Sequence, residues 1–173
     1  MSKIRVGVLR GGPSSEYEVS MQTGKSVLRN LSDKFLSHDI FISKSGEWHL
    51  GGIVKSPQKI LSKVDVVFNA LHGGYGEDGK VQQIMDELRV PYTGSRALAS
   101  ALGMNKITAK EIFKRHKIKV PNHIILKIGE DTKGKVYDIF RNFPQPCVVK
   151  PSSAGSSVGV VLATNFNSLV SAI

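Results

Sequence analysis

Residues 4–31 read IRVGVLRGGPSSEYEVSMQTGKSVLRNL, and this stretch decides the fold class. Its beginning, residues 4–9, is a short apolar run that leads to two glycines, which predicts a β-strand ending in a turn. From about residue 15 to residue 31, methyl-bearing side chains recur at every fourth position, which places them on one face of an α-helix. The stretch therefore predicts a strand, a turn and a helix, and the predicted helix face consists of Val19, Thr23, Val27 and Leu31.

The same alternation of strand and helix continues to about residue 94. Apolar runs at residues 39–42 and 64–71 predict two more strands, and residues 79–88 repeat the helical spacing. Residues 90–94 resemble a short further strand and a turn. Because strands that alternate with helices favour a parallel sheet with right-handed crossovers, the predicted fold class is α/β. We expect an open parallel sheet flanked by helices, as in Rossmann-like domains.

The pattern changes near residue 95, and we place a domain boundary between residues 1–95 and 96–173. After this boundary, a segment of small residues leads to a basic helix. The connection between the two strands that follow is too short for a parallel crossover, so they are expected to form an antiparallel hairpin. The predicted elements after the basic helix are a strand at 122–127, a helix at 133–143, hairpin strands at 147–150 and 158–163, and an Asn-capped helix at 165–173.

The net charge of +10 lies almost entirely in the second half of the chain. Residues 1–94 contain 12 Lys and Arg against 10 Asp and Glu, whereas residues 95–173 contain 12 against 4. Within the basic helix, lysines line one face and the other face is mostly apolar. This pattern is compatible with a solvated helix face or with a module that binds nucleic acid. The two faces are Lys106, Lys110, Lys114 and Lys117, and Ala109, Ile112, Phe113 and His116.

The N-terminus and the apolar segments indicate a cytoplasmic protein. Residues 1–6 lead directly into a strand, without the long apolar core of a signal peptide. No apolar run approaches the ~18 residues that a membrane span requires. Cys147, the one cysteine, lies in a predicted strand and is expected to be a small buried hydrophobe.

The glycine turn after the first strand carries the first candidate site residue. Ser15 and Glu18 have the spacing of a capping box, in which both side chains satisfy backbone amides at a helix N-terminus. Glu16 lies between them, at the carboxyl edge of the predicted sheet, where open α/β folds bind ligands. Its carboxylate could hold a substrate ammonium group, although Gly11 and Gly12 beside it could simply make a tight turn.

The second motif, LHGGYGEDG at residues 71–79, matches GxGxxG between a strand and a helix. A dinucleotide site is disfavoured, because Glu77 and Asp78 would place negative charge where a pyrophosphate should bind. These acids are instead expected to cap the helix N-terminus. His72 is either a packing residue or a donor to a substrate carboxylate or a developing oxyanion.

The third motif is the hairpin loop at residues 151–157, which follows Lys150 directly. Small residues leave backbone amides accessible, so the loop could fold over a triphosphate or could be a flexible surface hairpin. It is not a Walker loop, because the lysine precedes the glycine-containing segment and a strand follows it. Lys106, at the start of the basic helix, is a second possible phosphate partner.

Together, these motifs resemble the D-alanine:D-alanine ligase family of ATP-grasp enzymes. The resemblance covers residues 4 to about 162. Its ordered motifs are GGPSSEYEVS at 11–20, LHGGYGEDG at 71–79, PYTGS at 91–95, ASAL at 99–102 with Lys106, and VKP with GSSVG between 149 and 159. One departure from the family pattern is Asn105, which stands where an Asp is usual. The resemblance implies that residues 96–173 form a partial ATP-grasp central domain.

The resemblance also implies a reaction and roles for six residues. In this family, the γ-phosphate of ATP passes to one D-alanine, and the amine of a second attacks the acyl phosphate to give the peptidoglycan dipeptide. Glu16 would hold the first ammonium group and bond to Ser156, while His72 would polarise the carboxylate. The groups that would contact the ATP phosphates are Lys106, Lys150, Ser156 and Ser157.

The resemblance further implies partners and a limit. D-alanine, ATP and Mg²⁺ are expected ligands, a homodimer through the first domain is expected, and neither nucleic acid nor a membrane is an expected partner. The family's metal ligands and second-substrate residues would lie beyond residue 173, so we expect a truncated chain that is inactive alone. The alternatives are a ligase that uses D-lactate or D-serine as second substrate, and a non-catalytic module that binds nucleotide or nucleic acid.

Overall fold

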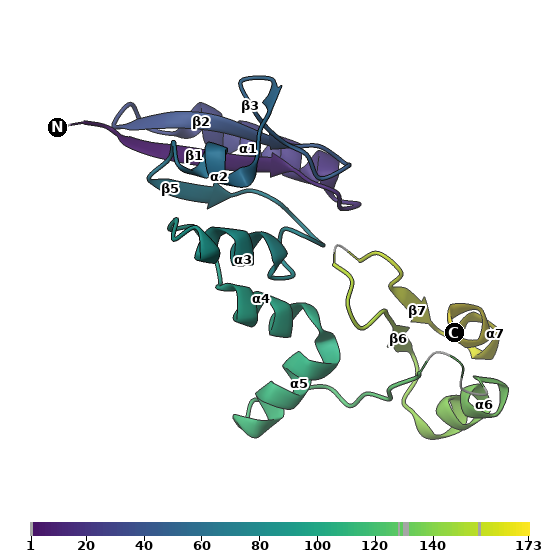
Figure 1. The fold of residues 1–173 in the computed structure, drawn as a ribbon. Coiled ribbons are helices and arrows are strands. Elements are labelled where there is room, and N and C mark those ends of the chain that lie inside the picture. The colour runs from purple at the N-terminus through teal and green to yellow at the C-terminus, as the bar shows by residue number, and fades with distance from the viewer. Residues whose placement is uncertain (1, 128, 130–131, 156) are drawn as a thin grey trace. The chain divides into compact units, whose positions relative to one another are not determined.

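The computed structural model describes residues 2–127, 129, 132–155 and 157–173 of the chain, without the side chains of residues 132 and 133. These residues form two compact units, Met1–Met104 and Asn105–Ile173 (Figure 1). Each unit is described by itself. The domain boundary between residues 95 and 96 stays a prediction.

The first unit is built on a sheet of five strands in the order β4-β3-β2-β1-β5 (Figure 1). β1 lies between β2 and β5 and pairs with both in parallel. β3 and β4 extend the sheet beyond β2 as antiparallel strands. The strands are β1 (Ile4–Gly11), β2 (Phe35–Ile42), β3 (Trp48–Leu50), β4 (Ile53–Val54) and β5 (Val66–Asn69).

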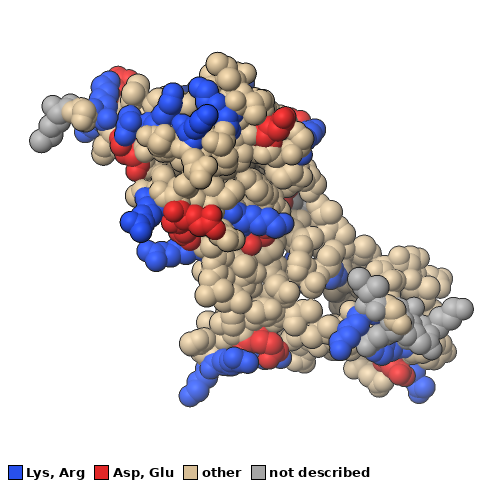
Figure 2. Space-filling model, viewed as in Figure 1, with Lys and Arg blue, Asp and Glu red and all other residues tan. Residues whose placement is uncertain are grey.

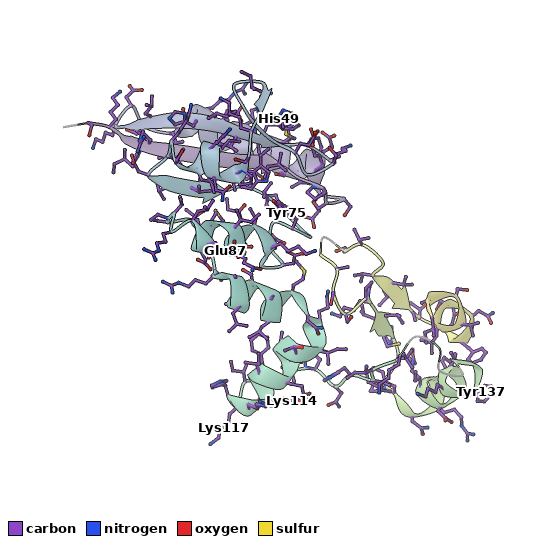
Figure 3. All side chains as sticks on the ribbon, in the orientation of Figure 1. His49, Tyr75, Glu87, Lys114, Lys117 and Tyr137 are labelled. Atoms are coloured by element: carbon purple, nitrogen blue, oxygen red, sulfur yellow. The ribbon has the colours of Figure 1, made fainter. Side chains whose placement is uncertain are left out.

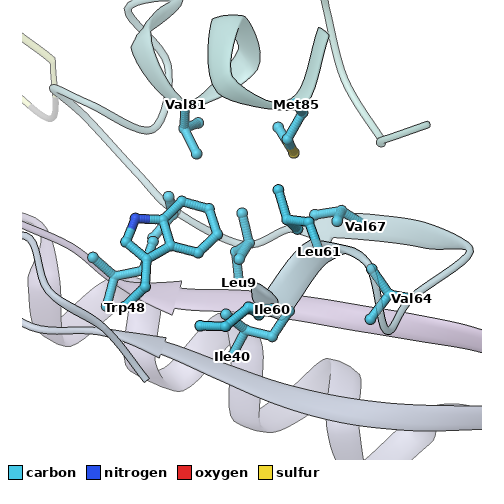
Figure 4. Packing of buried hydrophobic residues seen from close by; sticks show 11 residues of the cluster. Leu9, Ile40, Trp48, Ile60, Leu61, Val64, Val67, Val81 and Met85 are labelled. Carbon is cyan, nitrogen blue, oxygen red and sulfur yellow. The ribbon is translucent and has the colours of Figure 1, made fainter. Parts of the chain in front are cut away.

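Helices cover both faces of this sheet. α1 (Tyr17–Asn30) packs on the face that presents Val6 and Val8. The opposite face holds the main core, where α2 (Pro57–Leu61) and α3 (Lys80–Glu87) pack onto the strands. Figure 4 shows this core, in which Val81 and Met85 of α3 lie over Leu9 and Trp48. α4 (Ala97–Met104) contacts α3.

The predicted α/β class is confirmed, but the sheet is mixed rather than purely parallel. Parallel pairing holds for the central strands β2, β1 and β5. The antiparallel strands β3 and β4 have three and two residues, too few for an alternating pattern to be recognised in the sequence. The strand expected at residues 90–94 is reduced to a single parallel bridge between Val67 and Tyr92.

The buried face of α1 differs from the predicted one near its N-terminus. Val27 packs against the core as expected, but Val19 is 50% exposed, and the fully buried positions are Ser20 and Gly24. Ser20 accepts a hydrogen bond from Gly11 N at 2.8 Å and donates one to Ala70 O at 2.8 Å. Small residues thus bring the helix close to the sheet, which an apolar stripe cannot predict.

The described residues of the second unit form three helices and a two-stranded antiparallel sheet. β6 and β7 pair as the predicted hairpin, and Cys147 is buried between them and the helices. The final helix has the expected Asn cap at Asn165. The strand expected at 122–127 is absent, and Ile124 and Ile125 are exposed there. The elements are α5 (Lys106–Arg115), α6 (Thr132–Asn142), β6 (Cys147–Val149), β7 (Val161–Ala163) and α7 (Phe166–Ala172).

Side chains of both signs are visible on the first unit (Figure 2), and some of them form ion pairs across the sheet. Arg5 Nη2 lies 2.6 Å from Asp65 Oδ1, and Arg5 N donates to the same carboxylate at 2.7 Å. These hydrogen bonds lower the pKa of Asp65 from 3.8 to about 2. The pair links the beginning of β1 to the segment before β5.

We therefore expect acid to weaken the first unit through Asp65. Because the pKa is lowered on folding, the stabilisation is present above pH 3.8 and is lost as the pH falls through about 2. Asp65→Asn should lower the urea midpoint at neutral pH and remove part of this pH dependence, while Asp33→Asn, an exposed control, should leave the profile unchanged. Parallel profiles for wild type and Asp65→Asn would contradict this expectation.

Candidate functional site

Glu16 occupies the N-cap position of α1, directly after the glycine turn that ends β1. Its own N–H donates to Ser14 Oγ at 3.1 Å. The capping box predicted from Ser15 and Glu18 is wrong, because no side chain caps this helix and the cap position belongs to Glu16. The Glu16 carboxylate lies against Gly73, since a methyl group added to Gly73 would be 2.8 Å from Oε1.

His72 lies in the same part of the first unit and contacts α1 and the loop after β5. Its Nε2 is 2.9 Å from Thr23 Oγ1, and its Nδ1 is 3.6 Å from Glu77 Oε1. The Thr23 hydroxyl donates to Val19 O, so its oxygen can accept a hydrogen bond from the N–H of His72 Nε2. Ser14 Oγ donates to His72 O at 2.7 Å. Through Ser14, the backbones of Glu16 and His72 are held together.

Glu77 has a different role from the predicted helix cap. Its carboxylate accepts the Gly73 N–H at 3.1 Å, and its own N–H donates to Gly73 O at 2.9 Å. The capping prediction is correct for Asp78, whose carboxylate accepts the N–H of Lys80, the first residue of α3. Although burial opposes the shift, hydrogen bonds from Tyr75 and Lys80 lower the pKa of Asp78.

Side-chain hydrogen bonds stabilise the loop that carries His72 and Glu77. The amide groups of Asn69 and Gln82 both donate to Gly76 O, at 2.9 and 2.7 Å. Trp48 Nε1 donates to the hydroxyl of Tyr75 at 3.0 Å, and burial raises the pKa of this tyrosine. Tyr75 (labelled in Figure 3) has a backbone φ of 71°, a conformation that tertiary contacts must enforce. These partners could not be identified from the sequence.

The first unit thus brings the carboxylate of Glu16 against Gly73, the residue that follows His72. Glu16 follows β1 and His72 follows β5, and the absence of a side chain at Gly73 lets the Glu16 carboxylate approach the backbone there. A carboxylate can hold an ammonium group, and an imidazole can donate to a carboxylate. This arrangement suits the two charged groups of a free amino acid.

In the second unit, the beginning of α5 is joined to the loop between β6 and β7. Lys106 N donates to Ser152 O at 2.8 Å, and Lys106 Nζ donates to Ala154 O at 2.5 Å. Asn105 caps the helix, since its side-chain oxygen accepts the N–H groups of Ile107 and Thr108. The Asn that departs from the family pattern therefore performs the capping that an Asp would perform.

The loop itself carries the other predicted phosphate ligands. Lys150 is exposed at the end of β6, where the loop begins. Ser157 has a φ of 60°, and its carbonyl accepts the Val160 N–H, which makes a tight turn. Ser156 lies outside the described residues, and so does its predicted bond to Glu16. Accessible amides and lysines at such a loop can contact phosphate oxygens.

The described residues contain neither a cluster of three metal-binding side chains nor a membrane-spanning helix. In this part of the chain, no three His, Cys, Asp or Glu side chains gather where they could hold a metal ion. No helix among the described residues has the length and apolar character needed to cross a membrane.

The contact between Glu16 and Gly73 can be tested with a matched pair of variants. Gly73 has a φ of 67°, and an added methyl group would displace the Glu16 carboxylate, whereas Gly74 has nothing within 4 Å. We expect Gly73→Ala to weaken amino-acid use by about 10- to 100-fold through this displacement, and Gly74→Ala to have little effect. Kinetics of both variants would check this, and equal effects would contradict the geometry.

Two family models match most of this chain, and several known proteins match nearly all of it. A model described as the D-ala D-ala ligase N-terminus matches residues 5–60 and 52–95, and one described as the D-ala D-ala ligase C-terminus matches residues 112–173. The chain is 40% identical to the D-alanine--D-alanine ligase of Geobacter sulfurreducens, over 98% of the chain and 50% of that protein. It is 35% identical to the ligase of Natranaerobius thermophilus, over 100% of the chain and 56% of that protein.

Solved structures match in the same way. The D-alanine-D-alanine ligase from Coxiella burnetii superposes with a TM-score of 0.84 at 27% identity, covering 98% of this chain and 59% of that one. The VanG D-Ala:D-Ser ligase from Enterococcus faecalis gives a TM-score of 0.79 at 30% identity, covering 99% and 59%. The chain thus spans about half the length of the curated relatives that it matches.

Proposed function

The chain belongs to the D-alanine:D-alanine ligase family, and from this premise we propose that it forms part of an enzyme that joins two D-alanines at the expense of ATP. The observation that carries the proposal is the approach of the Glu16 carboxylate to Gly73, the residue that follows His72 in the chain. This geometry supports binding of a free amino acid at the first unit. The dipeptide product would serve peptidoglycan synthesis.

In the proposed mechanism, the first unit binds and orients the first D-alanine. Glu16 accepts hydrogen bonds from the substrate ammonium group. His72 donates to the substrate carboxylate from Nδ1, once the 3.6 Å contact of this nitrogen with Glu77 Oε1 gives way to the substrate. Thr23 and Glu77 orient the His72 ring from its two nitrogens. Partial neutralisation of the carboxylate makes its attack on the γ-phosphate of ATP less unfavourable, because the two groups otherwise repel each other.

The second unit would hold the phosphates of ATP. Lys106 and Lys150 neutralise phosphate charge, and Ser157 and the neighbouring loop amides donate to phosphate oxygens. Positioning and charge neutralisation are the main contributions that proteins make to phosphoryl transfer. Transfer of the γ-phosphoryl group to the D-alanine carboxylate releases ADP and gives an acyl phosphate. The amine of a second D-alanine then attacks its carbonyl carbon, inorganic phosphate leaves, and the proton of the amine passes to solvent. The Ser156 contact, the Mg²⁺ requirement, the dimer and the cytoplasmic location stay predictions.

The proposal is tested with the protein expressed from its complete gene. Incubation with ATP and D-alanine should release ADP and give D-alanyl-D-alanine, identified by chromatography against both stereoisomers. L-alanine should not support ADP release. Activity with L-alanine alone, or none with D-alanine, would contradict the proposed substrate. The same assay with D-serine or D-lactate added to D-alanine tests the alternative second substrates. A mixed product would show that the enzyme uses one of them.

A further inference from the structure

The lysines at the two ends of α5 have different partners. Lys114 lies near the C-terminal end of α5 (Figure 3), where its ammonium group is 3.3 Å from Glu111 Oε1. Lys106, at the first turn, instead donates to the loop carbonyl of Ala154. The basic face predicted from the sequence is therefore not uniform: one end is paired on the surface, and the other end meets the hairpin loop.

Lys110 lies one turn after Lys106, near the end of α5 that contacts the hairpin loop. It lies four residues after Lys106, so both side chains project from the same face. It is half-buried, whereas Lys114 is exposed. Partial burial lowers the pKa of Lys110, and the positive charges of Lys150 and Lys114 lower it further. Lys106 N donates to Ser152 O, so the loop that follows Lys150 lies against the helix turn that precedes Lys110.

This group of lysines has no negative partner in the described part of the chain. None of the carboxylates there forms an ion pair with Lys106, Lys110 or Lys150. Like charges that converge without a counter-charge destabilise the folded chain unless an anion binds between them. The backbone geometry holds them in place, because the first turn of α5 is hydrogen-bonded to the loop at Ser152.

We propose that Lys110 is a third phosphate-binding residue of the nucleotide site, acting with Lys106 and Lys150 on the polyphosphate chain. This inference rests on the proposed function and adds a residue that the motifs do not include. The polyphosphate of ATP carries several negative charges, and three converging ammonium groups match it better than two. Binding of phosphate relieves the repulsion between Lys110 and Lys150.

The experiment measures the affinity of the 173-residue chain for inorganic tripolyphosphate. Titration calorimetry at low and moderate salt gives this affinity. Lys110→Gln should weaken binding by about tenfold, as expected for the loss of one charged contact. Lys114→Gln is the matched control, with the same change of charge one turn further along the helix, and should change affinity less than twofold. Lys110→Arg should retain most of the affinity, and circular dichroism checks folding.

The outcomes separate this inference from the proposed function. If Lys106→Gln and Lys150→Gln weaken binding but Lys110→Gln does not, the inference is overturned and the proposed nucleotide site stands. Equal losses for Lys110→Gln and Lys114→Gln would also overturn it, since they would indicate a general electrostatic effect. A wild-type chain that does not bind tripolyphosphate would overturn both the inference and the assignment of phosphate binding to this loop.

Discussion

Replacing Lys150 by methionine is expected to lower kcat for D-alanine-dependent ADP release by about 10²–10³-fold, measured in the protein expressed from its complete gene. Methionine preserves the length and most of the apolar stem of lysine but removes the charge. Lys150 stands exposed where β6 enters the loop, so its loss leaves no cavity in the core. The reduction would therefore report on phosphate charge rather than on folding.

The control for this variant is Lys114→Met. Lys114 lies in the same unit and pairs with Glu111 on the surface of α5. Exposed pairs of this kind contribute about 0–1 kcal/mol, so neither folding nor turnover should change appreciably. If Lys150→Met retained nearly full kcat, Lys150 would not be a phosphate ligand.

Replacing Glu16 by glutamine is expected to lower kcat/KM for D-alanine by about 10- to 100-fold, with ATP use affected much less. The amide has the shape of the carboxylate but lacks the charge that an ammonium group needs. Because Glu16 N rather than its side chain takes part in the hydrogen bond with Ser14, the backbone at the start of α1 is retained. Steady-state kinetics with each substrate varied in turn would measure the effect.

Glu87→Gln is the charge-matched control for Glu16→Gln. Glu87 ends α3 (Figure 3), and its carboxylate accepts a hydrogen bond from Gln83 on the surface. This variant should leave kcat/KM for D-alanine unchanged. Comparable losses for both variants would mean that total charge, rather than an ammonium site at Glu16, governs the use of D-alanine.

The central part of the fold could be predicted because its sequence signals are strong. β1, α1, β5 and α3 show apolar runs or helical spacing that local chemistry favours, and all four occur. The signals fail where tertiary contacts decide. Residues 122–127 have the composition of a strand, but without a pairing partner in the described residues they form none. Trp48 enters the core from a strand too short to show a pattern.

The sequence predicts the main residues of the candidate site, Glu16 and His72, but not the side chains that contact them. Glu16 follows the glycine turn after the first strand and His72 precedes two glycines after another strand, and these positions single them out in the sequence. The helical spacing places Thr23 on the apolar face of α1 and predicts only packing for it. In the structure, its hydroxyl contacts His72. Glu77 follows the rule for acids near a helix start but binds the Gly73 N–H instead. Such contacts depend on the path of the loop, which spacing does not encode.

The most direct test of the account is an NMR titration of the isotope-labelled chain with D-alanine. Binding at the first unit should shift the backbone signals of Gly73 and Glu77 and the side-chain signals of His72, and Glu16→Gln should abolish these shifts. L-alanine at the same concentrations should leave them unchanged. If D-alanine produced no shifts around Gly73, or if both enantiomers produced the same ones, the amino-acid site proposed for this chain would be wrong.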